Sequence, residues 1–133
     1  IIENIKNIKF DIIVINENID NFLKNSTYLE IIINKANYII INSDVKNSNL
    51  LLKNTLTKVI TYGLNRKSSI TLSSIKEDNT MICVQRAIND INNKTIEEQE
   101  INVKIEKNNI NKTYNTLAMF AILKIYGENL KKI

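Results

Sequence analysis

The sequence lacks histidine, proline and tryptophan, and its 133 residues include only one cysteine and two glycines. Without histidine, His-based catalytic triads and most zinc sites are excluded. One cysteine cannot form an intrachain disulfide, and Gly63 and Gly127 cannot form a phosphate-binding glycine loop. The composition therefore excludes more classes of function than it suggests.

Long apolar runs are also missing from the sequence. The longest, residues 117–123, has seven residues, whereas a transmembrane helix needs about 20. No segment with the pattern of a signal peptide opens the chain, so we expect a cytoplasmic protein with no membrane contact. The apolar content of 44% and the length predict a single domain, residues 1–133, with its own core.

What the sequence does contain is a strong bias toward two residue types, with 27 isoleucines and 23 asparagines. We interpret this bias as the codon usage of an AT-rich, low-GC bacterial genome. The net charge is +4, and 16 of the 18 basic residues are lysines spread along the chain. Nucleic-acid-binding surfaces gather Lys and Arg with interleaved aromatic residues, so we do not expect a nucleic-acid partner.

The first half of the chain alternates between strand and helix patterns. Short β-branched apolar runs at residues 10–16, 38–42 and 58–62 predict strands that are buried on both faces, as in a parallel sheet. Residues 28–36, preceded by a capping box of Thr27 and Glu30, and residues 48–54 predict the connecting helices.

After Gly63 the pattern changes to alternating polar and apolar residues, which is typical of antiparallel strands with one solvated face. The last element is a strongly apolar helix with Gly127 at its C-terminal cap. The sequence thus predicts a three-layer α/β fold. A short parallel sheet with flanking helices covers residues 10–62, a small antiparallel three-stranded patch covers residues 69–106, and a buried C-terminal helix covers residues 112–126.

Two polar segments follow predicted parallel strands, at the sheet edge where ligands of open α/β proteins bind. After the second strand come Asn42 and Asp44, which either contact a polar ligand or form an ordinary Asx turn. After the third strand come Arg66 and Lys67, which either hold an anion or form a solvated basic turn.

Other chemically active residues point to no catalytic or metal site. Cys83 stands in an alternating strand and has no histidine to activate it, so we interpret it as a small hydrophobic residue. Glu97, Glu98 and Glu100 are adjacent carboxylates that we expect to be solvated rather than bound to a metal. We therefore predict no catalytic residue and no metal ligand.

Three segments occur in an order that is known from one enzyme family. A strand ends in Asn42 and Asp44, the next strand ends in Tyr-Gly at Gly63, and the first turns of a later helix contain Asn115 and Ala118. This order resembles the later half of the central domain of Mur ligases, the ATP-dependent amino-acid-adding enzymes of peptidoglycan synthesis. That family has an Asn-x-Asp-Asp motif, a Tyr-Gly strand end, an antiparallel patch and a His-Asn-x-x-Asn-x-x-Ala-Ala helix. The resemblance covers residues 38–127.

The departures from the family limit what the resemblance implies. The P-loop, the Mg-binding carboxylate, the modified lysine and the amino-acid-binding domain of the family are not visible. The last Asp of the first motif is replaced by Val45, and the His of the helix motif by Asn111, whereas Asn115 is kept. The resemblance thus implies a degenerate ATP-binding site whose candidate contacts are Asn42, Asp44, Arg66, Asn111 and Asn115. It implies no ligase activity for this chain alone.

These observations support several hypotheses. The first is a non-catalytic Mur-ligase-like module, a binding or interaction protein linked to cell-wall synthesis, with no cofactor and an unidentified protein partner. The alternatives are a remnant that binds ATP or another adenine nucleotide weakly, a ligase part completed by residues or a partner outside this chain, and an unrelated α/β domain. An exposed sheet edge at the Phe10 strand also favours a homo-oligomer.

Overall fold

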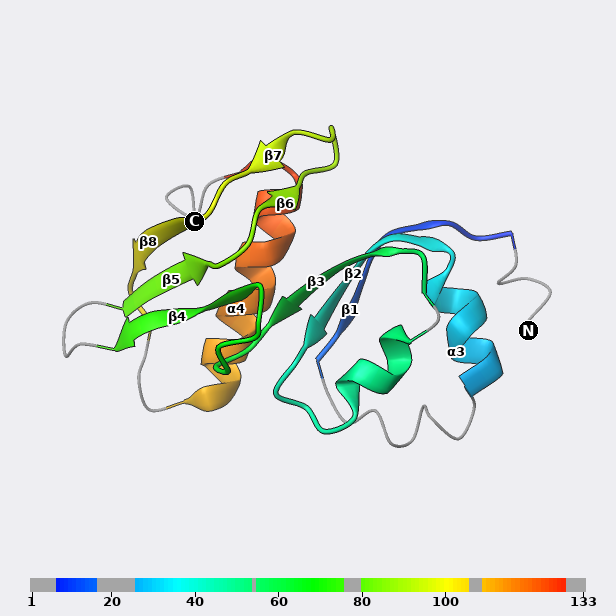
Figure 1. Cartoon of the computed structure of the whole chain (residues 1–133), viewed down its shortest axis with the longest axis horizontal. Coiled ribbons are helices and arrows are strands. Elements are labelled where there is room, and N and C mark those ends of the chain that lie inside the picture. Colours follow the sequence, from blue (N-terminus) through cyan, green and yellow to red (C-terminus); the bar gives the residue numbers. More distant parts are fainter. Residues whose placement is uncertain (1–6, 17–25, 54, 76–79, 106–108, 129–133) are drawn as a thin grey trace.

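The computed structural model of the protein describes residues 7–16, 26–53, 55–75, 80–105 and 109–128. Within them, a six-stranded mixed sheet runs in the order β1-β2-β3-β4-β5-β8, and β6 and β7 form a separate two-stranded hairpin (Figure 1). The strands of the large sheet are β1 (Phe10–Ile15), β2 (Ala36–Asn42), β3 (Lys58–Tyr62), β4 (Ile70–Ile75), β5 (Thr80–Val84) and β8 (Gln99–Val103).

The first half of the sheet is parallel and the second half is antiparallel, as the sequence predicts. β1, β2 and β3 are parallel, and β3 joins β4 through a single parallel pair, Tyr62 with Ile70. β4, β5 and β8 then form the antiparallel patch. The three-layer α/β expectation is confirmed, because helices cover both faces of the sheet.

One face of the sheet is covered by α3 (Ser26–Ile33) and by the 3₁₀ helix η1 (Ser48–Leu52). Ile39 and Ile41 of β2 pack there against Ile33 and Leu51. The neighbouring residues of β2, including Ile40, face the other side, so β2 is buried on both faces. This burial explains its continuous β-branched run. Because α3 begins at Ser26, Thr27 lies inside the helix, and the predicted capping box is wrong.

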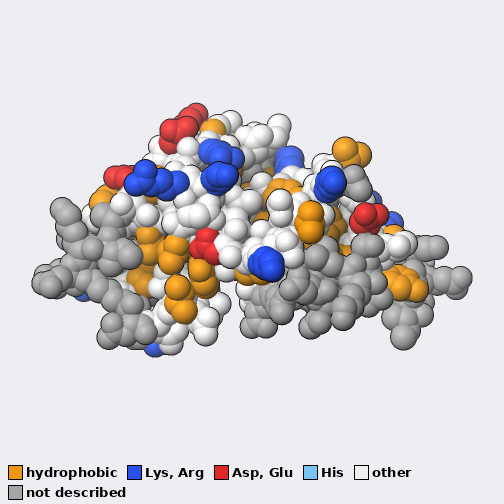
Figure 2. All heavy atoms as spheres, turned by 60° about the horizontal axis from the view of Figure 1, so that its bottom comes forward, with side chains coloured by type: hydrophobic (Ala, Val, Ile, Leu, Met, Phe, Trp, Pro, Cys, Tyr) orange, Lys and Arg blue, Asp and Glu red, His pale blue; other side chains and the backbone are white. Residues whose placement is uncertain are grey.

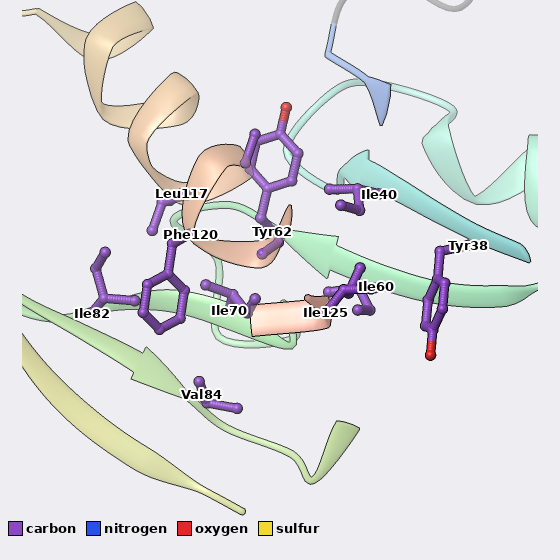
Figure 3. Packing of buried hydrophobic residues seen from close by; sticks show 12 residues of the cluster. Tyr38, Ile40, Ile60, Tyr62, Ile70, Ile82, Val84, Leu117, Phe120 and Ile125 are labelled. Carbon is purple, nitrogen blue, oxygen red and sulfur yellow. The ribbon is translucent and has the colours of Figure 1, made fainter. Parts of the chain in front are cut away.

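The other face is covered by α4 (Ile110–Ile125), which carries the larger core. Figure 3 shows Leu117 and Phe120 of α4 facing Ile70 and Ile82 of the sheet. The helix is less buried than expected, since Met119 is 47% exposed on its outer side. The apolar residues on that side of the helix had led us to expect that the helix is buried around almost its whole circumference.

Both ends of α4 are capped by residues that the structure describes. The Asn109 side chain accepts a hydrogen bond from the Lys112 amide over 3.2 Å, so the helix begins two residues before the expected start. At the other end Gly127 has a φ of 74° and donates its amide to Lys124 O over 3.1 Å. The C-cap residue itself is Tyr126, one position before the predicted cap, and Gly127 follows it as the positive-φ glycine that ends the helix.

The hairpin of β6 (Ile88–Asn89) and β7 (Thr95–Ile96) was not predicted. Its turn is organised by Asp90, whose Oδ1 accepts hydrogen bonds from the amides of Asn92 and Lys94. The hydroxyl of Tyr38 donates to Asp90 O over 2.7 Å and attaches the hairpin to β2. No helix in the described ranges is long and apolar enough to cross a membrane.

Candidate functional site

The loops after β2 and β3 enclose a hollow at the carboxyl edge of the parallel strands. Its volume is about 810 Å³, and it opens on the side of the sheet that carries η1. Figure 2 brings this end of the molecule forward and shows basic side chains spread over it, with an acidic side chain near the centre. The hollow is lined by polar, charged and apolar side chains, which include Ser43, Asp44, Val45, Lys46, Leu52, Asn65, Arg66 and Lys67.

Asp44 holds the two loops together. Its Oδ1 accepts the backbone amide of Asn65 over 3.2 Å and also the Asn65 side-chain amide. Its Oδ2 accepts the amide of Leu64 and, over 3.0 Å, the hydroxyl of Tyr114 from α4. Partial burial by itself raises the pKa of the Asp44 carboxyl, but these hydrogen bonds outweigh it and bring the pKa below its usual 3.8.

A second set of hydrogen bonds surrounds Ser43. Its hydroxyl lies 2.6 Å from the Ser68 hydroxyl and accepts the Asn65 side-chain amide over 3.0 Å. Gly63 passes through this narrow space, since a Cβ there would lie 2.8 Å from Asp44 Oδ1 and 2.9 Å from Ser68 Oγ. The Tyr-Gly strand end thus allows the two loops to approach each other closely.

Asn42 shapes the loop rather than the hollow. It is 2% exposed, and its Oδ1 accepts the Asp44 amide over 3.0 Å. This is the Asx turn that the sequence offered as an alternative to ligand contact. Asn65 does the same in the next loop, where its Oδ1 accepts the Lys67 amide over 2.8 Å. The two turns together set the directions in which Lys46, Arg66 and Lys67 leave the backbone.

The five candidate contacts do not gather at one place. Asp44 and Arg66 line the hollow, whereas Asn42 is buried beside it. Asn111 is exposed on the first turn of α4. Asn115 lines a different hollow of about 290 Å³, together with Lys104, Ile105, Lys112, Thr116 and Met119.

Sequence reasoning missed three residues of this site. Lys46 lines the hollow, Asn65 connects both loops, and Tyr114 reaches Asp44 from α4. Lys46 could have been found, because the carboxyl ends of parallel neighbours meet at one edge and bring their following loops together. The sequence gave no indication that Tyr114 belongs to the site, because an aromatic residue on an apolar helix face is expected to be a core residue.

The remaining candidates are Cys83 and three neighbouring glutamates. Burial raises the pKa of the Cys83 thiol, and the nearby carboxylates of Glu100 and Glu98 raise it further, which opposes thiolate formation. Glu97, Glu98 and Glu100 are all exposed. Among the residues that the structure describes, no group of three or more His, Cys, Asp or Glu side chains could hold a metal ion.

Comparison with protein-family models and with curated proteins gave no match to this chain.

Proposed function

We propose that this chain is a non-catalytic binding module with the architecture of a Mur-ligase central domain, and that it binds an anionic small molecule in the hollow after β2 and β3. One observation carries the proposal. Lys46 from one loop and Arg66 and Lys67 from the other line the same 810 Å³ space. Cationic side chains that converge on a hollow at this edge of a sheet favour an anionic ligand.

The charges around the hollow leave these cations available. In the described part of the chain, no carboxylate forms an ion pair with the side chain of Lys46, Arg66 or Lys67. Among the described residues that line the hollow, Asp44 is the one acidic residue, and its carboxylate accepts hydrogen bonds from both loops and from α4. An incoming anion would meet the positive charges of Lys46, Arg66 and Lys67, which outnumber the one negative charge of Asp44 among the described lining residues.

The expected affinity is low. Hydrogen bonds to charged groups contribute about 1.5–3 kcal/mol each, and association costs at least about 4 kcal/mol. Three such contacts therefore leave binding in roughly the millimolar range, unless apolar contacts add to it. Affinity of this order suits a module that senses or holds a metabolite.

The non-catalytic part of the proposal rests on the sequence. Phosphoryl transfer depends on positioning and charge neutralisation, for which the family uses a P-loop and a magnesium ion. The sequence has no glycine-rich loop. ATP-dependent ligation by the isolated chain would contradict this part. A role near cell-wall synthesis follows only from the resemblance. A cytoplasmic location is proposed as well, since that compartment keeps a lone thiol such as Cys83 reduced.

The proposal is tested by measuring ligand-induced thermal stabilisation with pyrophosphate, AMP, citrate and neutral adenosine. We expect the anions, but not adenosine, to stabilise the protein. Arg66→Gln combined with Lys67→Gln should remove the effect. The matched control combines Arg86→Gln with Lys94→Gln, which removes the same charge from exposed positions that do not line the hollow. Stabilisation by none of the anions, or its loss in both double variants, would contradict the proposal.

A weak adenine-nucleotide site is the second candidate. It is favoured by the smaller hollow, where Asn115 lies beside the apolar side chains of Ile105 and Met119 and the cation of Lys112. In this case adenosine itself should bind, and Asn115→Ala should abolish binding while Asn111→Ala should not. Unchanged binding in Asn115→Ala would place the adenine elsewhere.

A further inference from the structure

The hydrogen bonds of Asp44 restrict the chemistry of the hollow. A carboxylate has about four lone-pair positions, two on each oxygen. Oδ1 accepts both Asn65 donors, and Oδ2 accepts the Leu64 amide and the Tyr114 hydroxyl. Every acceptor position of Asp44 is thus filled by the protein itself.

A divalent cation and the present loop geometry therefore compete for the same oxygens. Mg²⁺ binds carboxylate oxygens at about 2.0–2.1 Å and would displace donors from Asp44. The displaced groups belong to Leu64 and Asn65, which begin the loop that carries Arg66 and Lys67. Metal binding to Asp44 would release the two cations from their positions beside the hollow.

The cations themselves match a multiply charged tetrahedral anion. Arg66 offers planar paired donors, and Lys46 and Lys67 each offer three ammonium hydrogens. A phosphate monoester carries a charge of about −1.5 to −2 at pH 7 and presents three acceptor oxygens. A single carboxylate has about half that charge and only two oxygens. It would therefore leave more of the donors of Lys46, Arg66 and Lys67 without an acceptor.

The hollow also offers contacts to more than the phosphate. Val45 and Leu52, both half-buried, line it beside the cations. An organic group attached to the phosphate would cover these side chains and gain from their burial. Inorganic phosphate would leave them in contact with water.

Resting on the proposed function, we infer that the ligand of this hollow is a small phosphate ester, held directly by Lys46, Arg66 and Lys67 without a divalent cation on Asp44. Asp44 acts as a positioning residue, because it fixes the loop of Arg66 and Lys67 and touches no ligand atom. The hollow thereby differs from a nucleotide site that binds phosphates through magnesium.

The inference is tested by calorimetric titration of the full chain with ribose 5-phosphate, in EDTA and again in excess Mg²⁺. Inorganic phosphate and citrate serve as the other two probes. We expect the ester to bind with the same affinity, within about twofold, in both buffers, and to bind more tightly than either probe. Lys46→Gln should weaken ester binding by about tenfold or more, as expected for the loss of a charge-assisted contact. Lys94→Gln should leave it unchanged.

Asp44→Asn separates positioning from simple electrostatics. Removal of a negative charge beside an anion would strengthen binding if the loop kept its shape, whereas a positioning role predicts weaker binding. Tyr114→Phe keeps the charge, removes one donor, and should weaken ester binding slightly. Circular dichroism would show whether both variants are folded.

The outcomes distinguish this inference from the proposed function. Binding that requires Mg²⁺, citrate that binds as tightly as the ester, or inorganic phosphate that equals the ester would each overturn the inference and leave an anion-binding module in place. Binding of none of these probes would overturn both.

Discussion

The Tyr114 hydroxyl donates a hydrogen bond of 3.0 Å to Asp44 Oδ2, across 70 positions of sequence. This contact joins the first turns of α4 to the loop after β2. Asp44 also binds the loop after β3 through Leu64 and Asn65. One carboxylate thus connects three segments that surround the carboxyl edge of the parallel strands, and its removal should affect both stability and binding.

Asp44→Asn should destabilise the protein at neutral pH. Hydrogen bonds to a charged group are worth about 1.5–3 kcal/mol, but the carboxylate is partly exposed, so we expect a loss of about 1–2 kcal/mol. Because folding lowers the Asp44 pKa below 3.8, this contribution is present above that pH and disappears as the folded carboxyl is protonated. Urea unfolding should show the difference between wild type and variant shrinking below about pH 4. A difference that stays constant down to pH 3 would contradict a role for the charge.

Two tyrosines of one core should respond oppositely to the loss of their hydroxyls. Tyr38 donates to Asn89 O and Asp90 O over 2.9 and 2.7 Å. The Tyr62 hydroxyl is fully buried and has no hydrogen-bond partner among the described residues, and burial, together with Tyr114, raises its pKa to about 12. Tyr38→Phe should cost about 1–2 kcal/mol, whereas Tyr62→Phe should be neutral or stabilising by up to about 1 kcal/mol. Chemical denaturation of the two variants measures this, and equal losses would show that the Tyr62 hydroxyl has a partner.

The two glycines should differ in their effect on binding. A Cβ at Gly63 would press on Asp44 and Ser68, so Gly63→Ala should cost about 1–3 kcal/mol and also weaken anion binding. At Gly127 no atom of the described residues lies within 4 Å of an added Cβ, and the φ of 74° is the unfavourable feature. Gly127→Ala should therefore cost about 1 kcal/mol and leave binding intact. Thermal unfolding with and without pyrophosphate measures both effects. Equal loss of binding in the two variants would indicate general destabilisation rather than a local change at the hollow.

A homo-oligomer would form most readily along β1. This strand pairs only with β2 in the described sheet, and its side chains are almost all apolar, with Val14 39% exposed. We expect a dimer in sedimentation velocity, and Val14→Lys should shift it to the monomer, because lysine blocks edge pairing. Asn102→Lys, at the opposite edge strand β8, adds the same charge and should leave the dimer intact. A monomeric wild type, or dissociation only in Asn102→Lys, would exclude the β1 edge.

The fold was predictable where burial imposes a simple sequence pattern. The β-branched runs of β2 and β3 reflect burial on both faces, and the alternating segments reflect the antiparallel patch. The β6–β7 hairpin was missed because its two-residue strands are too short to show a period. It is held by the Tyr38 hydroxyl, a contact over some 50 residues that no local pattern encodes.

The site was predictable only in part, for a geometric reason. The strand ends indicated that Asp44 and Arg66 would lie near each other, and both line the same hollow, because neighbouring parallel strands finish at the same edge. Asn115 follows Tyr114 by one residue, and one helical step turns its side chain by about 100°. Tyr114 therefore reaches Asp44 while Asn115 lines another hollow. Sequence spacing gave no way to decide which of the two would face the strand ends.

The central claim is that an anion binds between the loops after β2 and β3, and it is tested most directly by mapping amide chemical shifts during titration with pyrophosphate. The account predicts concentration-dependent shifts of residues 43–49 and 64–68, and none at Lys104, Lys112 or Asn115 beside the second hollow. Shifts confined to the second hollow, or no shifts at millimolar pyrophosphate, would contradict it.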